Sequence, residues 1–113
     1  MSPVPSRDPI PPGTLDMLVL RTLARHGELH GFEIAEGISR VSAEVLQVEE
    51  GSLYPALQRM LLKGWVSAEW GRTDGNRRAR YYRLTPAGRR HLDRQVESYQ
   101  RIARAIARVL QPN

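Results

Sequence analysis

The end of the sequence places the strongest constraint on the fold. Thr85 and Pro86 are typical of a helix start, because Thr caps a helix N-terminus and Pro at the first helical position has no N–H to leave unbonded. From there a helix is expected to continue to about Leu110, just before Pro112. Roughly 25 residues form a rod about 37 Å long. A chain of 113 residues forms one small domain, on which so long a helix cannot pack along its whole length.

The apolar side chains of this helix alternate spacings of four and three residues, which is the pattern of a coiled-coil seam. The seam consists of Leu92, Val96, Tyr99, Ala103, Ile106 and Leu110. Ile102 and Val109 widen it, so that the helix can meet more than one partner helix. Because a second copy would complete the small core of such a chain, we predict a homodimer interface along the seam. The alternative is that the helix folds back over its own core.

Three upstream stretches have the period of amphipathic helices. The first follows Thr14 and ends at Gly27, the second spans about residues 31–41, and the third opens at Ser52 as its N-cap and ends at Gly64. Residues 1–13 contain five of the eight prolines and are predicted to form a flexible arm. The chain is therefore divided into an arm (1–13), a helical and hairpin domain (14–85) and a C-terminal dimerisation helix (86–113).

After the third helix, the spacing of apolar residues changes from that of a helix to that of a strand. Residues 66–70 and 79–85 alternate as strands do, and Asp74-Gly75 between them is a strong hairpin signal. Trp65 and Trp70 are expected in the core of this hairpin. Three helices, a small β-hairpin and a long last helix predict a mainly α fold, the winged helix-turn-helix.

Charge is distributed unevenly along the chain. Residues 1–56 contain 4 Arg and 8 acidic residues, whereas residues 57–113 contain 13 Lys or Arg and 4 acidic residues, which leaves a net charge of +5. Nearly all the basic residues are Arg, whose planar guanidinium suits bidentate contacts with phosphate and guanine. A basic half beside an acidic half indicates a polyanionic partner, either nucleic acid or an anionic membrane. A solvated, Arg-rich surface is the alternative.

Several function classes are excluded by what the sequence lacks. The absence of Cys removes disulfides, Cys-based zinc sites and thiol nucleophiles. No apolar run approaches the roughly 20 residues that span a bilayer, and no signal peptide is visible at the start, so we expect a cytoplasmic protein. The sequence shows no combination of a nucleophile, a general base and a residue that orients the base, and no Gly-rich phosphate-binding loop. Neither an enzyme nor a cofactor is therefore predicted.

His26, Glu28 and His30 form an H-x-E-x-H segment between the first two helices. Two His and one carboxylate can hold zinc, but this spacing is not that of a standard structural site and Gly27 loosens the segment. We therefore predict no metal, and expect His30 to cap or contact the second helix.

The third helix is the candidate for DNA recognition, because recognition helices meet base edges through their N-terminal residues. Ser52 and Tyr54 can donate to phosphate, Pro55 can contact a thymine methyl, and Gln58 or Arg59 can reach bases. Arginines of the hairpin can reach the minor groove or flanking phosphates. The predicted DNA-binding residues are Ser52, Tyr54, Pro55, Gln58, Arg59 and Lys63 on the helix and Arg72, Arg77, Arg78 and Arg80 in the hairpin. An ordinary surface helix is the alternative.

Three segments in this order resemble the PadR family of bacterial transcriptional regulators: HGFEI (30–34), EEGSLYPALQRMLLKGWV (49–66) and RARYYRLTPAGRR (78–90). The single C-terminal helix is similar to the short subgroup of that family. The resemblance implies a winged helix-turn-helix homodimer that represses transcription by occupying a palindromic operator. It also places Ser52, Tyr54 and Pro55 at the DNA-facing start of the recognition helix. Phe32 departs from the pattern, because the family usually has Tyr there, and that phosphate contact is not carried over.

Two further expectations concern partners. Some members of the family bind drug-like effectors on aromatic residues at the dimer interface, where Tyr99 would lie; packing of Tyr99 within the seam is the reading that we favour. A protein-interaction adaptor built on the same winged fold is the alternative function. The basic hairpin and the exposed Tyr54-Pro55 pair argue against it, because an adaptor needs neither. A membrane-surface role is not expected, because the last helix lacks a bulky aromatic apolar face.

Overall fold

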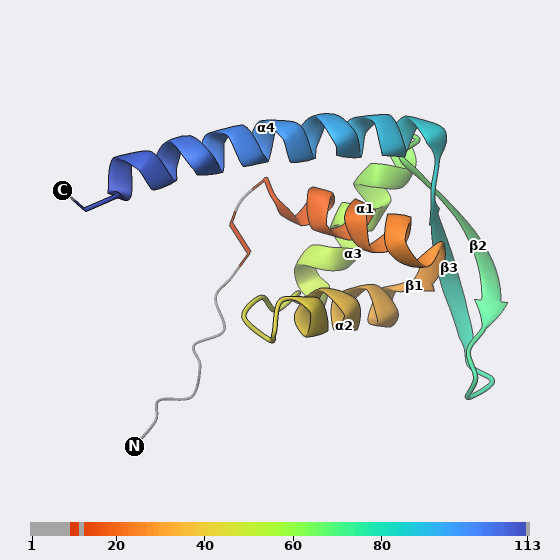
Figure 1. Cartoon of the computed structure of the whole chain (residues 1–113). Coiled ribbons are helices and arrows are strands. Elements are labelled where there is room, and N and C mark those ends of the chain that lie inside the picture. Colours follow the sequence, from red (N-terminus) through yellow and green to blue (C-terminus); the bar gives the residue numbers. More distant parts are fainter. Residues whose placement is uncertain (1–9, 12, 113) are drawn as a thin grey trace, which may run out of the picture.

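The computed structural model describes residues 10–11 and 13–112, so most of the predicted arm lies outside the described residues. The elements follow in the order α1 (Leu15–His26), β1 (Glu28–His30), α2 (Gly31–Val41), α3 (Glu50–Leu62), β2 (Val66–Arg72), β3 (Arg78–Leu84) and α4 (Pro86–Leu110). Three helices precede a projecting hairpin, and a long helix ends the chain (Figure 1). The predicted winged helix-turn-helix fold with a long last helix is therefore confirmed.

The sheet contains one strand that the sequence analysis missed. β1 pairs antiparallel with β3, whose other edge pairs with β2. Glu28 of β1 lies opposite Arg83 of β3 and forms an ion pair with it. His30 follows as the N-cap of α2, where its Nδ1 accepts a hydrogen bond from the Glu33 amide at 3.4 Å, which confirms its predicted capping role. Residues of the H-x-E-x-H segment thus have partners within the chain, and the described residues contain no group of three metal-ligating side chains.

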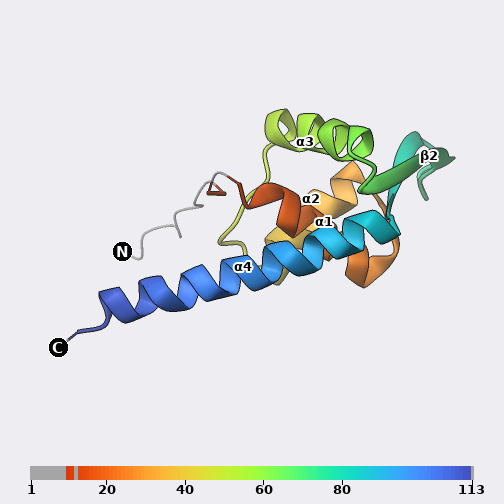
Figure 2. The ribbon, with the colours of Figure 1, turned by 90° about the horizontal axis from the view of Figure 1, so that it is seen from above.

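The core lies around α1, which packs against α2, α3, α4 and the sheet. Figure 2 shows α3 and α4 on opposite sides of α1. Leu20 and Leu23 of α1 and Leu57 of α3 are fully buried, as is Leu92 of α4. No helix of residues 10–11 and 13–112 combines the length and the apolar character needed to cross a membrane.

α3 begins earlier than the sequence pattern indicates. The carbonyl of Glu49 accepts hydrogen bonds from the amides of Ser52 and Leu53, so Glu49 is the N-cap and Ser52 lies within the first turn. The prediction of Ser52 as the N-cap is therefore wrong. Although Ser is the better capping residue, a carboxylate in the first turn is favoured by the helix dipole, and Glu50 supplies one. Pro55 consequently lies inside the helix, where it removes one backbone hydrogen bond.

The start of α4 is tied to the end of α3. Thr85 caps α4 as predicted, since its Oγ1 accepts from the Gly88 amide at 3.0 Å and also donates to the Gly64 carbonyl at 2.6 Å. The Thr85 amide donates to the Trp65 carbonyl at 3.0 Å. These bonds set the direction in which α4 leaves the sheet. Its first half packs on α1, and its second half extends beyond the body of the domain (Figures 1 and 2).

Trp65 joins the two helices through its ring. It packs against the core and stacks on His91 of α4, with ring centroids 3.6 Å apart and planes inclined by 11°. The Nζ of Lys63 lies 4.9 Å from the centroid of the same Trp65 ring. Burial of the imidazole lowers the pKa of His91 below its ordinary value of 6.5, and the positive charges of Arg94 and Lys63 act in the same direction.

This stack predicts a pH-dependent stability. Because the pKa of His91 is lower in the folded chain, the unfolded chain binds more protons below about pH 6.5, and the free energy of unfolding falls as the pH falls through that region. We expect the thermal midpoint to fall by a few degrees at most between about pH 7.5 and 5.5. His91→Phe, which keeps an aromatic ring but cannot titrate, should show a smaller fall. The exposed His26→Phe is the matched control; a pH dependence equally large in wild type and His91→Phe would contradict the assignment.

Candidate nucleic-acid interface

The outer side of α3 is free of the core. Leu53, Ala56, Leu57 and Met60 bury the opposite side of the helix almost completely. All six residues predicted on this segment are exposed, namely Ser52, Tyr54, Pro55, Gln58, Arg59 and Lys63. The side of α3 that carries them is therefore open to a partner.

Tyr54 is held in place by the start of α2. A Cβ atom added at Gly31 would lie 2.8 Å from the Tyr54 hydroxyl and 2.9 Å from its ring, so the absence of a side chain at Gly31 makes room for this ring. Tyr54 nevertheless remains 48% exposed. Its hydroxyl is thus positioned at the junction of α2 and α3 while staying accessible.

Two predicted residues of α3 lie apart from Tyr54. Arg59 donates to Asp16 of α1 at 3.3 Å, an ion pair that the sequence pattern did not indicate. Lys63 lies at the other end of the helix, beside the Trp65 ring. Arg59 and Lys63 therefore do not line the cleft that contains Tyr54.

The turn of the hairpin confirms the signal at Asp74-Gly75. The Asn76 amide donates to the Thr73 carbonyl at 2.8 Å across this pair, and the Thr73 amide donates to the Arg77 carbonyl at 2.9 Å. Asn76 takes the left-handed conformation with φ of 60°, which Asn tolerates better than most residues. Arg72, Arg77 and Arg78 are exposed and Arg80 is half-buried. None of these four forms an ion pair within the part of the chain that the structure describes.

Trp70 contradicts the expectation that it lies in the hairpin core, because it is 58% exposed. Val66 on the same face of β2 is buried, but the strand then continues into a hairpin that projects beyond the helices (Figure 1). The guanidinium carbons of Arg78 and Arg80 lie 4.4 Å and 5.9 Å from the centroid of the Trp70 ring. Such cation–π contacts orient the arginines without neutralising them. Trp65, in contrast, packs against the core as expected.

A cleft of about 760 Å³ lies between the hairpin, the start of α2 and α3. Its lining includes the predicted residues Tyr54, Arg77, Arg78 and Arg80. Phe32 and Trp70 also line it, and sequence reasoning did not assign either to the interface. Only the departure from the family pattern at Phe32 pointed to that position, and no signal pointed to Trp70. The cleft therefore combines aromatic rings with cations that form no ion pair with any residue that the structure describes.

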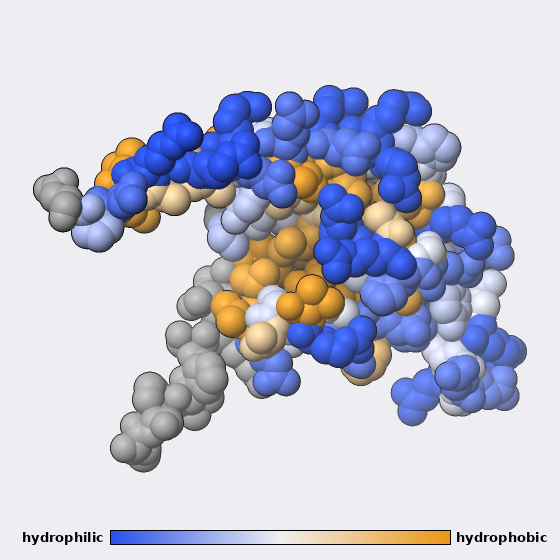
Figure 3. Space-filling model, viewed as in Figure 1, coloured by the Kyte–Doolittle hydropathy of each residue, from blue (hydrophilic) through white to orange (hydrophobic). Residues whose placement is uncertain are grey.

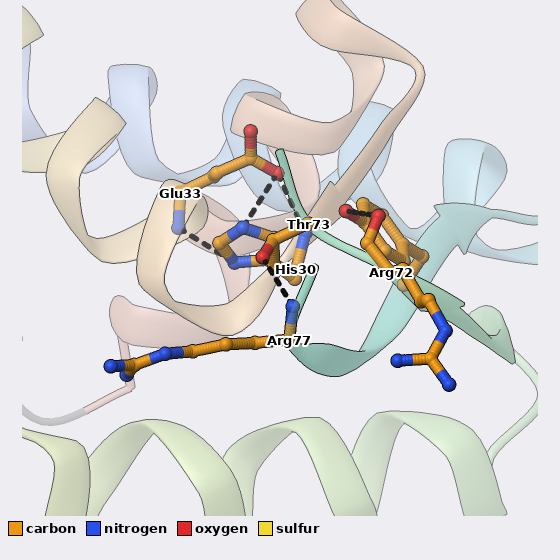
Figure 4. A network of polar contacts seen from close by, with 6 residues as sticks. His30, Glu33, Arg72, Thr73 and Arg77 are labelled. Carbon is orange, nitrogen blue, oxygen red and sulfur yellow. Dashed lines mark hydrogen bonds and ion pairs between the residues drawn. The ribbon is translucent and has the colours of Figure 1, made fainter. Parts of the chain in front are cut away.

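The base of the hairpin is connected to the cap of α2. His30 packs edge-on against Tyr81 of β3, with centroids 5.4 Å apart, and the Tyr81 hydroxyl donates to the Arg72 carbonyl at 3.1 Å. Figure 4 shows His30 and Glu33 beside the turn, where the Arg77 amide donates to Thr73 Oγ1. Desolvation and the carboxylate of Glu33 raise the pKa of Tyr81, so its hydroxyl stays protonated as a donor. This network fixes the position of the arginine-bearing turn relative to α2.

The predicted seam of α4 divides into two parts. Leu92 is fully buried in the core of its own chain, so its assignment to a dimer interface is wrong; Val96 also packs against that core. Farther along, Ala103 is half-buried, and the remaining apolar side chains are at least half exposed: Tyr99, Ile102, Ile106, Val109 and Leu110. Figure 3 shows hydrophobic surface at the free end of α4 and in the hollow below the helix.

Comparison with known proteins identifies the family. Residues 19–94 match the family described as the Transcriptional regulator PadR-like family. The chain belongs to the PadR family. "Transcriptional regulator Rv3488" of Mycobacterium tuberculosis is 35% identical over 83 residues, which cover 74% of each chain. An uncharacterised protein of Lysinibacillus sphaericus is 29% identical over 94 residues, covering 83% of this chain and 85% of its own. The family consists of transcriptional regulators, which are not enzymes.

Solved structures of transcriptional regulators share the fold. A transcriptional regulator from Clostridium thermocellum superposes with a TM-score of 0.79 at 26% identity, covering 88% of this chain and 95% of its own. A PadR family regulator from Clostridium difficile gives a TM-score of 0.74 at 27% identity and is covered completely. Bacillus subtilis PadR in complex with operator DNA gives 0.65 at 22% identity, with 74% of this chain and 47% of that chain covered. The last likeness concerns the fold alone.

Proposed function

We propose that this PadR-family regulator binds operator DNA sequence-specifically as a cytoplasmic homodimer and represses transcription. The observation that carries the proposal is the convergence of the open side of α3 and the arginine-bearing turn on one cleft. In winged-helix proteins the recognition helix enters the major groove while basic side chains of the wing reach the minor groove or phosphates. Support comes from Bacillus subtilis PadR, a protein of the same fold that forms a complex with operator DNA.

The roles follow from the position of each side chain. Ser52 and Tyr54 donate to phosphates, while Pro55 and Gln58 face base edges in the major groove. Arg59 and Lys63 contact the backbone, Arg59 after release from Asp16. Arg72, Arg77, Arg78 and Arg80 neutralise phosphates beside the minor groove, and Trp70 and Phe32 add apolar contact with the sugars.

The dimer forms through the free part of α4, from Tyr99 to Leu110, and the residues of 14–85 form the DNA-binding domain. A two-fold axis through that helix presents two copies of α3 to successive major grooves, about 34 Å apart on a palindromic site. Tyr99, whose ring is half exposed in the single chain, packs within the seam, and a small-molecule effector, where the regulator has one, binds beside it between the two copies of α4.

Replacing Tyr54 with Ala is expected to weaken specific binding by about tenfold to a hundredfold, because it removes a phosphate donor and an oriented ring worth about 1–3 kcal/mol. Because a phosphate donor acts on any sequence, affinity for an unrelated duplex should fall as well. The measurement is fluorescence anisotropy of operator and unrelated duplexes at one salt concentration. Tyr54→Phe separates the hydroxyl from the ring, and unchanged operator affinity in both variants would refute the role of Tyr54.

Replacing Arg77 and Arg78 together with Gln is expected to make binding less sensitive to salt. Each phosphate contact contributes about 0.9 to the slope of log affinity against log salt, so the slope should become shallower by about 1.8. The double variant Arg21→Gln and Arg25→Gln, which removes the same charge from α1, is the control and should keep the wild-type slope. Equal slopes for all three proteins would show that the turn does not contact DNA.

A further inference from the structure

One face of α4 carries a row of arginines that the proposed function does not use. Arg90, Arg94, Arg101, Arg104 and Arg108 follow one another at spacings of four, seven, three and four residues, and Glu97 lies on the same face between Arg94 and Arg101. At 100° per residue this row lies on the side of the helix opposite the apolar seam, and it is about 27 Å long. We call these five residues the arginine stripe.

The stability of the fold explains only Arg108 of the arginine stripe, which lies in the last turn of α4, where the helix dipole favours a cation. All five side chains are exposed, and no carboxylate of the described residues lies within 4 Å of any of their guanidinium groups. Like charges three or four residues apart destabilise a helix by about 0.2–0.5 kcal/mol per pair. Arg90–Arg94, Arg101–Arg104 and Arg104–Arg108 are such pairs. The last turns, from Ser98 to Leu110, contain no acidic residue at all.

The stripe lies away from the proposed DNA-reading surface. Figure 3 shows the outer side of α4 as continuously hydrophilic, whereas the hairpin turn is at the opposite end of the molecule in the same view (Figure 1). Because the stripe is opposite the apolar seam, pairing of two copies through that seam leaves both stripes facing solvent. A duplex bound to α3 and the hairpin therefore does not cover it.

We propose that the arginine stripe binds the phosphate backbone of a second DNA duplex, so that one protein holds two duplexes at once. This inference rests on the proposed function for the first duplex. Guanidinium groups bind phosphate bidentately, and a straight row of them matches a linear polyanion better than the scattered carboxylates of a protein surface. A membrane is a poorer partner, because a basic membrane-surface helix must insert its apolar face, and in the proposed dimer the second copy covers that face of α4.

The test uses the full-length protein and two duplexes. Protein is bound to a bead-tethered duplex selected for tight binding, unbound protein is washed away, and a fluorescent 20-base-pair duplex of unrelated sequence is added at low salt. The stripe variant replaces Arg101, Arg104 and Arg108 with Gln. The matched control replaces Arg21, Arg25 and Arg89 with Gln, which removes the same charge away from the stripe. Anionic phospholipid vesicles and poly-glutamate are offered separately to the same three proteins.

Wild type and control should capture the second duplex, and the stripe variant should capture at least about tenfold less of it. All three proteins should bind the tethered duplex equally. Loss of three phosphate contacts should also make the slope of log affinity for the second duplex against log salt concentration shallower by about 2.7. No capture by wild type, an equal loss in the control, or stripe-dependent binding of vesicles or poly-glutamate instead of duplex would overturn the inference. If the tethered duplex is not bound at all, the proposed function fails separately, and direct binding of the labelled duplex to the three free proteins still tests the stripe.

Discussion

Replacing Ile106 with Glu is expected to convert the protein from a dimer into a monomer. Ile106 is 53% exposed in the single chain and lies among the apolar side chains at the free end of α4. In the proposed dimer each copy would bury a carboxylate without a partner, at a cost of several kcal/mol. Since each 1.4 kcal/mol is tenfold, the dissociation constant of the dimer should rise by at least about a hundredfold. Sedimentation velocity at micromolar concentration measures the change, and operator affinity should fall with it.

Gln100→Glu is the matched control for this experiment. It introduces the same charge at an exposed position of α4 that faces away from Ile102, Ile106 and Val109. This variant should remain dimeric and keep operator binding. A wild-type protein that sediments as a monomer, or an Ile106→Glu variant that stays dimeric, would show that α4 does not form the interface.

Replacing Gly88 with Ala should cause the largest loss of stability. A Cβ atom there would lie 2.0 Å from the Trp65 carbonyl oxygen and 2.9 Å from Leu84 Cδ1. The carbonyl cannot retreat freely, because it accepts the Thr85 amide that starts α4. We expect a destabilisation of about 3 kcal/mol, which for a domain of this size lowers the melting temperature by more than about 10 °C.

Gly51→Ala serves as the comparison, because no heavy atom lies within 4 Å of a Cβ added at that position of α3. Ala is the better helix residue, so this variant should be as stable as wild type or slightly more stable. Thermal unfolding followed by circular dichroism compares the two. Equal melting temperatures for Gly88→Ala and wild type would mean that the start of α4 does not pack against Trp65 as described.

Local signals made most of the element boundaries predictable. Gly27 ends α1, Thr85-Pro86 begins α4, and Asp74-Gly75 turns the hairpin, because each depends only on residues next to it in the chain. β1 was not predicted because a strand of three residues is too short to show an alternation of apolar and polar side chains. The strand exists only through pairing with β3, more than fifty residues away.

The candidate site was harder to predict than the fold, because the regular spacing of apolar residues does not show where the core ends. Trp70 continues the alternation of Val66 but lies beyond the helices, and Leu92 continues the seam of α4 but lies inside the body. Arg59 has a guanidinium group suited to contact DNA, yet it forms an ion pair with Asp16 of α1. Each of these differences arises from contacts between distant parts of the chain, which local spacing does not record.

The most direct test of the proposed function is selection of duplexes from a random pool by the purified protein at two salt concentrations, followed by the stoichiometry of the selected complex. We predict an inverted repeat whose half-sites lie about one helical turn apart, bound by one dimer, with an affinity that falls as salt rises. Failure to enrich any sequence, or binding that ignores sequence and disappears at modest salt, would contradict the proposed function and favour an adaptor or a general nucleic-acid binder.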